Sequence, residues 1–298
     1  MQWDDLKVFL AVARAESLSG AGRELRLDPA TAGRRIARLE ADCGAPLFLK
    51  SPQGYTLTDA GARLLTHAAR AEAAIASGSA DISGAGDSLS GQIRIGAPDG
   101  CATFLLPKVC ADISAENPGL EFQIVALPRV FNLSRREADM AIAVTPPQTG
   151  RMTVQKVTDY HLHLAASPRY LKRHPEIAQV ADLKAHRIIG YLPDMIFDKG
   201  LDYLSELGAQ RLDFGSNSVL VQFQFVNNGA GVGIVHDFAL PFGQNLRRLL
   251  PDQLSLRRSF YLIRPADDRK IDRLNRIAAM VSTGLRAEVA RLEALAPS

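Results

Sequence analysis

Apolar residues recur at helical spacing at the start of the chain. The residues concerned are Trp3, Leu6, Phe9, Leu10 and Ala13, and they follow one face of a predicted amphipathic helix. A second, shorter helix is expected up to Leu25. Ser17 or Ser19 would be its N-cap, because a hydroxyl oxygen there accepts a hydrogen bond from a free backbone amide.

Two neighbouring residues mark the start of a third helix. Asp28 is a good N-cap, and Pro29 suits the first helical position because proline has no N–H to leave unsatisfied. We expect this helix to run to about Asp42 and to end at Gly44, since glycine readily adopts the left-handed conformation of a C-cap. Two short helices with a tight connection, the second rich in arginine, predict a helix-turn-helix unit.

The next segments predict a hairpin and a long helix. Residues 46–57 place Pro-Gln-Gly between two apolar pieces, which indicates a small hairpin such as a DNA-contacting wing. Thr58 then caps an Ala-rich helix. Four of its residues are spaced by 4, 3 and 4 positions, the rhythm of a coiled-coil seam: Leu64, Ala68, Ala71 and Ile75. So narrow a stripe favours burial against a second copy of the same helix.

A flexible joint separates two halves of the chain. In residues 77–91, nine of fifteen are Gly or Ser, a composition typical of a hinge. Beyond it, a strand at 93–97, a helix at 103–116 and strands at 120–127 and 140–144 alternate. This order predicts a parallel sheet with helices on its faces.

A second series of elements predicts a second lobe. Strands are expected at 160–165, 187–191, 211–214 and 232–235, with helices near 201–207 and from Ser218. The fold class is therefore α/β with two lobes and a crevice, preceded by an all-α winged helix-turn-helix. The amphipathic residues 271–295 should pack back on the first lobe, so that the chain crosses between the lobes twice.

Composition excludes several classes of protein. Of the 298 residues, 47% are hydrophobic and 22% charged, which excludes a mostly disordered chain and a disulfide-rich miniprotein. The net charge of +3 does not by itself indicate nucleic acid. Polar residues interrupt the longest uncharged stretch, residues 214–236, so no membrane helix is expected. The N-terminus, Met-Gln-Trp-Asp-Asp, lacks the basic start of a secretory signal.

The cysteines suit a reducing compartment. Cys43, Cys101 and Cys110 are odd in number and have no C-x-x-C spacing, which favours a cytoplasmic protein. If Cys101 and Cys110 share one helix, they lie about 13.5 Å apart along its axis, too far for a disulfide. A thiol at a helix start can have a lowered pKa, so Cys101 is a candidate sensor, although a packed small residue is the simpler interpretation.

Residues 3–61 resemble the N-terminal part of the LysR-type transcriptional regulators. The resemblance rests on three motifs at characteristic spacings: Arg35-Ile36-x-x-Leu39-Glu40, the pair Leu47-Phe48, and Leu57-Thr58-x-x-Gly61. It extends over the whole chain. It implies a winged helix-turn-helix, a dimerising linker helix and a two-lobed effector domain similar to periplasmic solute-binding proteins, in a protein that acts as a dimer or tetramer.

These expectations give three segments. Residues 1–58 form the DNA-binding domain, residues 59–90 the linker helix and hinge, and residues 91–298 the effector-binding domain. Lobe one comprises 91–158 and 265–298, and lobe two comprises 159–264. Self-association is expected through residues 59–80.

The resemblance implies that the second helix of the motif and the wing contact double-stranded DNA. The candidates are Pro29, Thr31, Arg34, Arg35, Arg38, Lys50 and Gln53. The cationic side chains would neutralise phosphates, whereas Pro29 and Thr31 lie at the helix end that enters the major groove and are better placed to contact bases. The alternative is a solvated helix face on which the arginines pair with Glu40 and Asp42.

Four positions depart from the pattern of the family. Gly33 stands where such regulators often have Ser, and glycine costs a helix about 1 kcal/mol relative to Ala. Leu49 and Lys50 replace a usual Glu-Arg pair, and Gln53 replaces an Arg of the wing. These changes predict a weaker electrostatic hold on DNA.

Effector binding is expected where parallel strands end and helices begin. The leading segment is residues 100–103, with Gly100, Cys101 and Thr103, and Asn217 with Ser218 would face it from the other lobe. Arg129 could bind a carboxylate through two hydrogen bonds. These residues predict a small anionic effector, although Thr103 and Asn217 could be simple helix caps and Arg129 a surface residue.

Two other motifs are read as structural. His161 and His163 lie on one face of a strand with Asp159, an arrangement open to a metal ion, but alternating polar residues on a half-buried strand are the simpler explanation. Residues 229–233, Gly-Ala-Gly-Val-Gly, follow a helix and precede a strand, the reverse of the order in a dinucleotide-binding loop.

We expect neither an enzyme nor a cofactor, because the chain has no G-x-S-x-G elbow and no convincing Cys/His pair. The second hypothesis is a two-lobed solute-binding or metal-dependent catalytic protein whose N-terminal helices only mediate assembly.

Overall fold

The computed structural model describes residues 1–51, 54–82, 89–126, 138–147, 151–196, 203 and 211–297. The chain divides into two compact units, Met1–Gly91 and Gln92–Ser298. Each is described below by itself.

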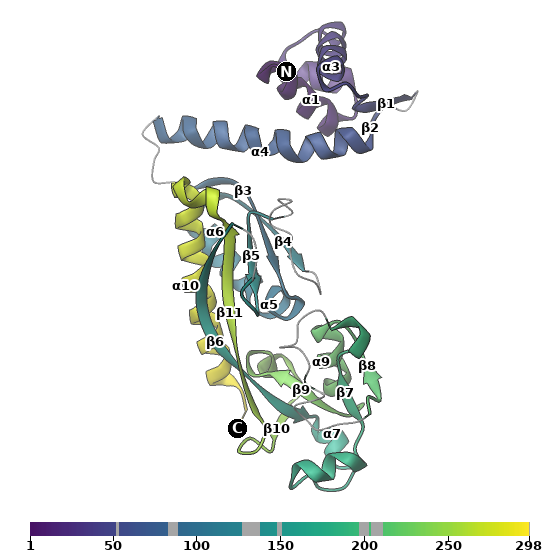
Figure 1. The fold of residues 1–298 in the computed structure, drawn as a ribbon, viewed down its shortest axis with the longest axis vertical. Coiled ribbons are helices and arrows are strands. Elements are labelled where there is room, and N and C mark those ends of the chain that lie inside the picture. Colours follow the sequence, from purple (N-terminus) through teal and green to yellow (C-terminus); the bar gives the residue numbers. More distant parts are fainter. Residues whose placement is uncertain are drawn as a thin grey trace. The chain divides into compact units, whose positions relative to one another are not determined.

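The N-terminal unit is a helical domain with a small hairpin (Figure 1). Its elements are α1 (Trp3–Ala15), α2 (Leu18–Leu25), α3 (Pro29–Cys43), β1 (Phe48–Ser51), β2 (Gly54–Leu57) and α4 (Asp59–Ile82). The Ser17 hydroxyl accepts a 2.9 Å hydrogen bond from the Gly20 amide, and Asp28 accepts hydrogen bonds from the amides of Ala30 and Thr31. Gly44 ends α3 at a φ of 66°. The predicted caps are thus confirmed.

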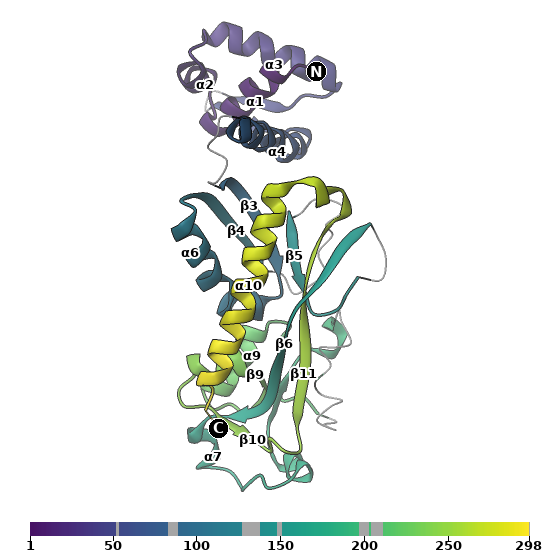
Figure 2. The ribbon, with the colours of Figure 1, turned by 90° about the vertical axis from the view of Figure 1, so that its left-hand side faces the viewer.

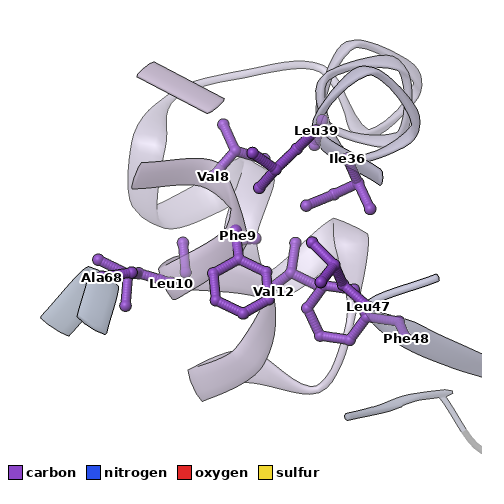
Figure 3. Packing of buried hydrophobic residues seen from close by; sticks show 12 residues of the cluster. Val8, Phe9, Leu10, Val12, Ile36, Leu39, Leu47, Phe48 and Ala68 are labelled. Atoms are coloured by element: carbon purple, nitrogen blue, oxygen red, sulfur yellow. The ribbon is translucent and has the colours of Figure 1, made fainter. Parts of the chain in front are cut away.

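One hydrophobic core holds this unit together (Figure 3). Phe9 and Phe48 lie near its centre with ring centroids 5.3 Å apart. The core residues drawn and labelled are Val8, Phe9, Leu10, Val12, Ile36, Leu39, Leu47, Phe48 and Ala68. Burial of these side chains fixes α3 against α1 and the hairpin.

The first half of α4 belongs to this same core. Leu64 and Ala68 pack into it, so these two positions of the predicted seam contribute to the chain's own domain. Ile75, further along, is 51% exposed. Thr58 caps α4 by accepting a hydrogen bond from the Gly61 amide at 3.0 Å. At Gly61 a Cβ would lie 2.1 Å from the Leu47 carbonyl oxygen, so only glycine permits this approach.

The first lobe of the C-terminal unit corrects one predicted helix. The lobe contains β3 (Ser90–Ala97), α5 (Asp99–Phe104), α6 (Leu106–Glu116), β4 (Gly119–Ala126) and β5 (Met140–Ala143). The single helix expected at 103–116 is two helices, because Pro107 has no N–H for the Thr103 carbonyl and the chain breaks at Leu105. Cys101 and Cys110 therefore lie on different helices, and the spacing argument against a disulfide does not apply.

The second lobe is connected to the first by two long strands. It contains α7 (Pro168–Leu171), β7 (Ile188–Gly190), β8 (Phe214–Gly215), α9 (Val219–Asn227), β9 (Val232–His236) and β10 (Arg247–Leu249). The antiparallel strands β6 (Met152–Ala166) and β11 (Ser255–Pro265) run through both lobes (Figure 2). The helix expected near 201–207 lies outside the described residues.

The sheet is mixed and not parallel throughout. Its order is β4-β3-β5-β11-β6-β9-β7-β8, with β10 paired to β6. β3 is parallel to β5, and β7 is parallel to β8 and β9, as predicted. β11 and β6 are antiparallel to their neighbours because each returns the chain from one lobe to the other. Residues 261–263 already pair with β5, so the second crossing precedes the boundary at residue 265 suggested by the sequence.

The last helix spans both lobes. α10 (Asp272–Leu295) contacts α6 and β6, and also the 3-10 helix Asp237–Phe242 of the second lobe. Its contact with β6 includes Glu293, which accepts a 2.7 Å hydrogen bond from the His161 amide. The expectation that it packs on the first lobe alone was therefore too narrow. Across the described part of the chain, no helix is both long and apolar enough to cross a membrane.

Candidate DNA-binding face and effector cavity

The outer face of α3 carries the residues predicted to contact DNA. Thr31, Arg34, Arg35 and Arg38 line one shallow hollow. Arg34 is exposed, and its Nη2 donates a 3.0 Å hydrogen bond to the Thr31 hydroxyl. Pro29 is exposed at the start of the helix. Hydrogen-bond donors and a positive charge thus point away from the core, where a nucleic acid could reach them.

Arg35 and Arg38 also serve the fold. Arg38 donates from Nε to Asp5 Oδ2 at 2.8 Å and from Nη2 to the other oxygen of the same carboxylate. Asp5 is fully buried, so Arg38 neutralises a charge that would be costly in the interior. This hydrogen bonding raises the pKa of Arg38. Arg35 Nη1 lies 3.4 Å from the Asp4 carbonyl oxygen and 3.8 Å from its carboxylate.

The alternative ion pairs within α3 are not found among the described residues. Glu40 accepts hydrogen bonds from the backbone amides of Leu47 and Phe48, at 2.8 and 3.2 Å. Asp42 pairs with the N-terminal ammonium group at 2.8 Å. The alternative in which the arginines pair with Glu40 and Asp42 is therefore wrong, because both carboxylates have other partners.

The hairpin contributes Lys50. This residue is exposed on β1 and lies opposite Tyr55 of β2. The Tyr55 amide donates a 2.9 Å hydrogen bond to the Glu16 carbonyl, which ties the hairpin to the end of α1. Gln53 lies outside the described residues.

A cavity opens between the two lobes of the C-terminal unit. It is lined by Pro98, Asp99, Gly100, Cys101, Val144, Tyr160, Tyr191, Asn217, Val219, His236 and Phe260. The hollow measures about 410 Å³ with its mouth open to solvent, but the centre of a water molecule can reach only about 20 Å³ of it. That space holds about one water. The cavity lies beyond the ends of β3, β5 and β9, where ligands of α/β proteins bind.

Most of the described effector candidates meet at this cavity. Gly100, Cys101 and Asn217 line it, and Ser218 reaches it through a hydrogen bond to Asp99. Thr103 does not line it, because α5 begins at Asp99 and leaves Thr103 inside the helix with an exposed side chain. Arg129 lies outside the described residues.

A hydrogen bond closes the cavity across the lobes. The Ser218 hydroxyl donates to Asp99 Oδ2 at 2.6 Å, and the same hydroxyl caps α9 by accepting from the Val221 amide at 3.4 Å. Asp99 Oδ1 accepts from the Gly100 amide at 2.9 Å. The N-cap of α9 is thereby joined to the first residue of α5.

Three stacked rings line one side of the cavity and are called its aromatic wall: those of Tyr160, His236 and Phe260. The ring of Tyr160 stacks on Phe260 at 4.2 Å and on His236 at 5.5 Å between centroids. Burial lowers the pKa of His236 to about 3, so its imidazole is neutral. The Tyr160 hydroxyl and His236 Nδ1 are buried and have no hydrogen-bond partner within the described parts of the chain. Such unpaired groups are rare in native interiors.

The cysteine in the cavity wall is a poor thiolate. Cys101 is 1% exposed, and burial raises its pKa, with a smaller contribution from Cys110. Burial also raises the pKa of Cys110, to about 11. The sensor hypothesis required a lowered pKa, so the structure contradicts it in this form.

The described lining residues of the cavity carry one negative charge and no positive charge from Lys or Arg. The negative charge is that of the Asp99 carboxylate. Arg258 lies opposite Tyr160 across β6 and β11, but it does not line the cavity, and its Nη1 donates to the Arg257 carbonyl at 3.1 Å. Arg129, the cation expected to bind an anionic effector, lies outside the described residues, so the anionic effector stays a prediction.

The histidines of β6 have separate partners. His161 Nδ1 lies 3.0 Å from Glu293, and His163 Nδ1 lies 2.8 Å from Asp237. Asp159 is held by Lys156, Arg257 and Ser259, and these contacts lower its pKa. No cluster of three His, Cys, Asp or Glu side chains able to hold a metal occurs among the described residues. Gly229 adopts a φ of 75° in the turn between α9 and β9, which confirms the predicted turn.

Sequence reasoning missed the polar and aromatic groups that define the cavity. Asp99 could have been found from the sequence, because it directly precedes the segment 100–103 that was expected to bind the effector. His236 is the last residue of β9, one position beyond the predicted strand. Tyr160, Tyr191 and Phe260 carried no such signal, since aromatic residues in a strand region are ordinarily core residues.

Comparisons with known proteins match both units. Residues 3–62 match the family model of the bacterial regulatory helix-turn-helix protein, lysR family, and residues 86–286 match that of the LysR substrate binding domain. A probable hydrogen peroxide-inducible genes activator of Mycobacterium avium is 29% identical over 259 residues, 82% of this chain and 80% of the relative. The HTH-type transcriptional regulator PtxR of Pseudomonas aeruginosa is 26% identical over 238 residues, 78% of this chain and 76% of the relative.

The fold agrees with these matches. The structure of a mutant of OxyR from Corynebacterium glutamicum superposes with a TM-score of 0.65 at 18% identity, covering 100% of this chain and 96% of that one. The chain belongs to the LysR family of DNA-binding transcriptional regulators, which join a helix-turn-helix unit to an effector-binding domain and act as oligomers.

Proposed function

We propose that α3 and the hairpin hold DNA through a small set of side chains. Arg34 is the leading phosphate contact, because it is exposed and its described hydrogen bond is to a neutral hydroxyl. Lys50 adds a second charge, and Pro29 and Thr31 lie at the base-reading end of the helix. Arg35 contributes less, and Arg38 acts mainly by positioning α3 through Asp5. Gln53 remains a candidate on the resemblance alone.

The functions of the chain are divided among the three predicted segments. Residues 1–58 bind DNA, residues 59–90 link and associate, and residues 91–298 bind the effector, with lobes that meet within β6 and β11. The protein acts by binding alone and not as an enzyme. It works in the cytoplasm, where free thiols such as those of its three cysteines persist.

The cavity between the lobes is the effector site of this proposal. The supporting observation is the Asp99–Ser218 hydrogen bond at the mouth of a space that holds about one water. A larger molecule enters only when this bond opens and the lobes shift. An effector that binds the open form more tightly shifts the population toward it, and the oligomer then presents its recognition helices differently.

Fluorescence anisotropy with the DNA upstream of the protein's own gene tests this function. We expect salt-sensitive binding that resists unspecific competitor DNA. Gly100→Ala should leave this binding intact but change its response to effector, because the added Cβ would lie in the cavity wall 3.3 Å from Val219 Cγ1, close enough that one of the two groups must shift. Binding that competitor DNA displaces completely would contradict a sequence-specific regulator.

A further inference from the structure

We propose that the effector carries a protonated amine, which the Asp99 carboxylate binds at the junction of the lobes in place of the Ser218 hydroxyl. Tyr160 and His236 supply the other two acceptors. This inference rests on the proposed function of the cavity and names the chemistry that the cavity selects.

Asp99 is a carboxylate that has no counter-ion among the residues that the structure describes. Its described hydrogen bonds come from the Ser218 hydroxyl and the Gly100 amide, both neutral donors. It forms no ion pair with any described Lys, Arg or His side chain. The residue is only partly exposed and sits between two lobes, where water screens its charge less than on an open surface. A cationic ligand would meet an unbalanced negative charge there.

The negative charge acts on the cavity itself. Burial raises the pKa of the Tyr191 hydroxyl, and the nearby groups Tyr203 and Asp99 raise it further. Tyr191 therefore stays neutral, and Asp99 is close enough to influence a ring that lines the opposite side. An anionic head group would be repelled by the same carboxylate, and no cation among the described lining residues offsets it.

Two buried acceptors remain free beside this charge. The Tyr160 hydroxyl and His236 Nδ1 belong to side chains that are 0% and 6% exposed, line the cavity, and have no hydrogen-bond partner within the described chain. His236 Cε1, which is bonded to Nδ1, faces Gly100 at the first turn of α5. Because the imidazole is neutral, Nδ1 can accept when the proton is on Nε2.

The three proposed acceptors equal the number of hydrogen-bond donors of a primary ammonium group. An ammonium has three N–H donors and no acceptor. From the residues that line the cavity, the proposal takes the Asp99 carboxylate, the Tyr160 hydroxyl oxygen and the His236 imidazole nitrogen as the three acceptors; Tyr191 and Asn217 also line it. The space of about 20 Å³ suits a head group of this size, while the rest of the ligand must extend into the wider mouth.

Binding would open the contact between the lobes. In the proposed complex the ammonium takes the place of the Ser218 hydroxyl, which lies 2.6 Å from Asp99 Oδ2 in this structure. Ser218 then keeps only its cap of α9. Recognition of charge and separation of the lobes become one event, which gives the effector unequal affinity for the two forms, as regulation requires.

Calorimetry with three probes of one skeleton tests the head group. Benzylamine, benzyl alcohol and benzoate differ in charge but little in shape. We expect the full chain to bind benzylamine at least about tenfold more tightly than the other two probes. A buried charge that gains an oppositely charged partner raises the binding affinity by that factor or more. Asp99→Asn should weaken benzylamine by roughly thirtyfold or more, and Ser218→Ala should strengthen it by removing the competing donor.

The control is Asp112→Asn, which removes an exposed carboxylate from α6 in the same lobe. It should bind benzylamine like the parent chain. Preference for benzoate, no benzylamine binding, or benzylamine binding that survives Asp99→Asn would each overturn the ammonium proposal. If benzoate binds and Gly100→Ala blocks it, the cavity remains the effector site and only the charge assignment fails. If Gly100→Ala changes the binding of no probe that binds, the cavity itself is wrong.

Discussion

The hydroxyl of Ser218 donates a 2.6 Å hydrogen bond to the carboxylate of Asp99, and this bond joins the lobes of the C-terminal unit. Its partners are 119 residues apart in the chain. Ser218 is also the N-cap of α9, so one side chain both starts a helix and closes the cavity.

A double-mutant cycle should separate these two roles. Ser218→Ala loses the contact and the cap of α9, whereas Asp99→Ala loses the contact and the hydrogen bond from the Gly100 amide. We expect a coupling free energy of about 1 kcal/mol or more, since hydrogen bonds to charged groups are stronger than neutral ones. Urea unfolding of the C-terminal unit in the four chains measures it. The cap loss cancels in the cycle, so a coupling near zero would show that the bond does not hold the lobes together.

Arg34 and Arg38 should respond differently to truncation. Arg34→Ala is expected to weaken binding to specific and random DNA alike, lowering the slope of log affinity against log salt by about one, with unchanged stability. Arg38→Ala should lower the unfolding midpoint, because it leaves the buried carboxylate of Asp5 without its partner.

The neutral double variant Asp5→Asn with Arg38→Gln provides the matched control. It removes both charges and should recover part of the midpoint that Arg38→Ala loses. Arg211→Ala, on an exposed residue of the other unit, should alter neither DNA binding nor the midpoint of the N-terminal unit. Equal stability of the Arg34→Ala and Arg38→Ala chains would refute the positioning role of Arg38.

Local features of this fold can be predicted from the sequence. The caps at Ser17 and Asp28 form hydrogen bonds to amides two or three residues away, so residue type and position suffice to predict them. Gly44 is predictable for the same reason, since its left-handed φ of 66° is a property of the residue itself.

Contacts between distant segments were not predictable in this way. Arg38 was expected to contact phosphate, because the sequence does not show that it pairs with Asp5. This partner lies 33 residues earlier, on another helix. The cavity was located from strand ends, but its polarity depends on Tyr160 and His236, which two antiparallel strands bring together. Periodicity gives the face of a strand and not the neighbour that it receives.

Two glycines of the N-terminal unit should behave in opposite ways. At Gly33 a Cβ would lie 3.4 Å from Leu18 Cδ1, an ordinary contact, so Gly33→Ala should stabilise the helix by up to about 1 kcal/mol. At Gly61 the Cβ would meet the Leu47 carbonyl oxygen at 2.1 Å, so Gly61→Ala must displace α4 and destabilise the unit. Thermal unfolding compares the two, and a stable Gly61→Ala chain would contradict the close approach.

The thiols should differ sharply in reactivity. Cys43 is exposed, whereas Cys101 and Cys110 are buried with raised pKa values. In the folded chain we expect rapid modification of Cys43 alone by a thiol reagent at neutral pH, because the thiolate is the reactive form. Cys43→Ser should remove the rapid phase, and denaturation should expose the other two. Rapid labelling of Cys101 in the folded Cys43→Ser chain would restore the sensor hypothesis.

Stability should fall in acid partly because of His236. Burial lowers its pKa to about 3 in the folded chain, whereas an unfolded histidine titrates near about 6.5. Between these values the unfolded chain binds a proton that the folded chain excludes. The neutral imidazole therefore costs nothing above about pH 6.5, and below it the folded state loses about 1.4 kcal/mol per pH unit down to about pH 3.

Replacement of His236 isolates this contribution from the titration of carboxylates, which is common to both chains. His236→Phe keeps an aromatic ring beside Tyr160 and Phe238 but cannot take up a proton. Urea unfolding between pH 7 and 4 should show a shallower decline for His236→Phe than for the parent chain. His67→Gln, on an exposed residue of α4, serves as the control and should retain the parent slope in the C-terminal unit. Identical slopes for His236→Phe and the parent would mean that the imidazole is hydrated and ionises freely, and His236 could not then act as a neutral acceptor for an ammonium group.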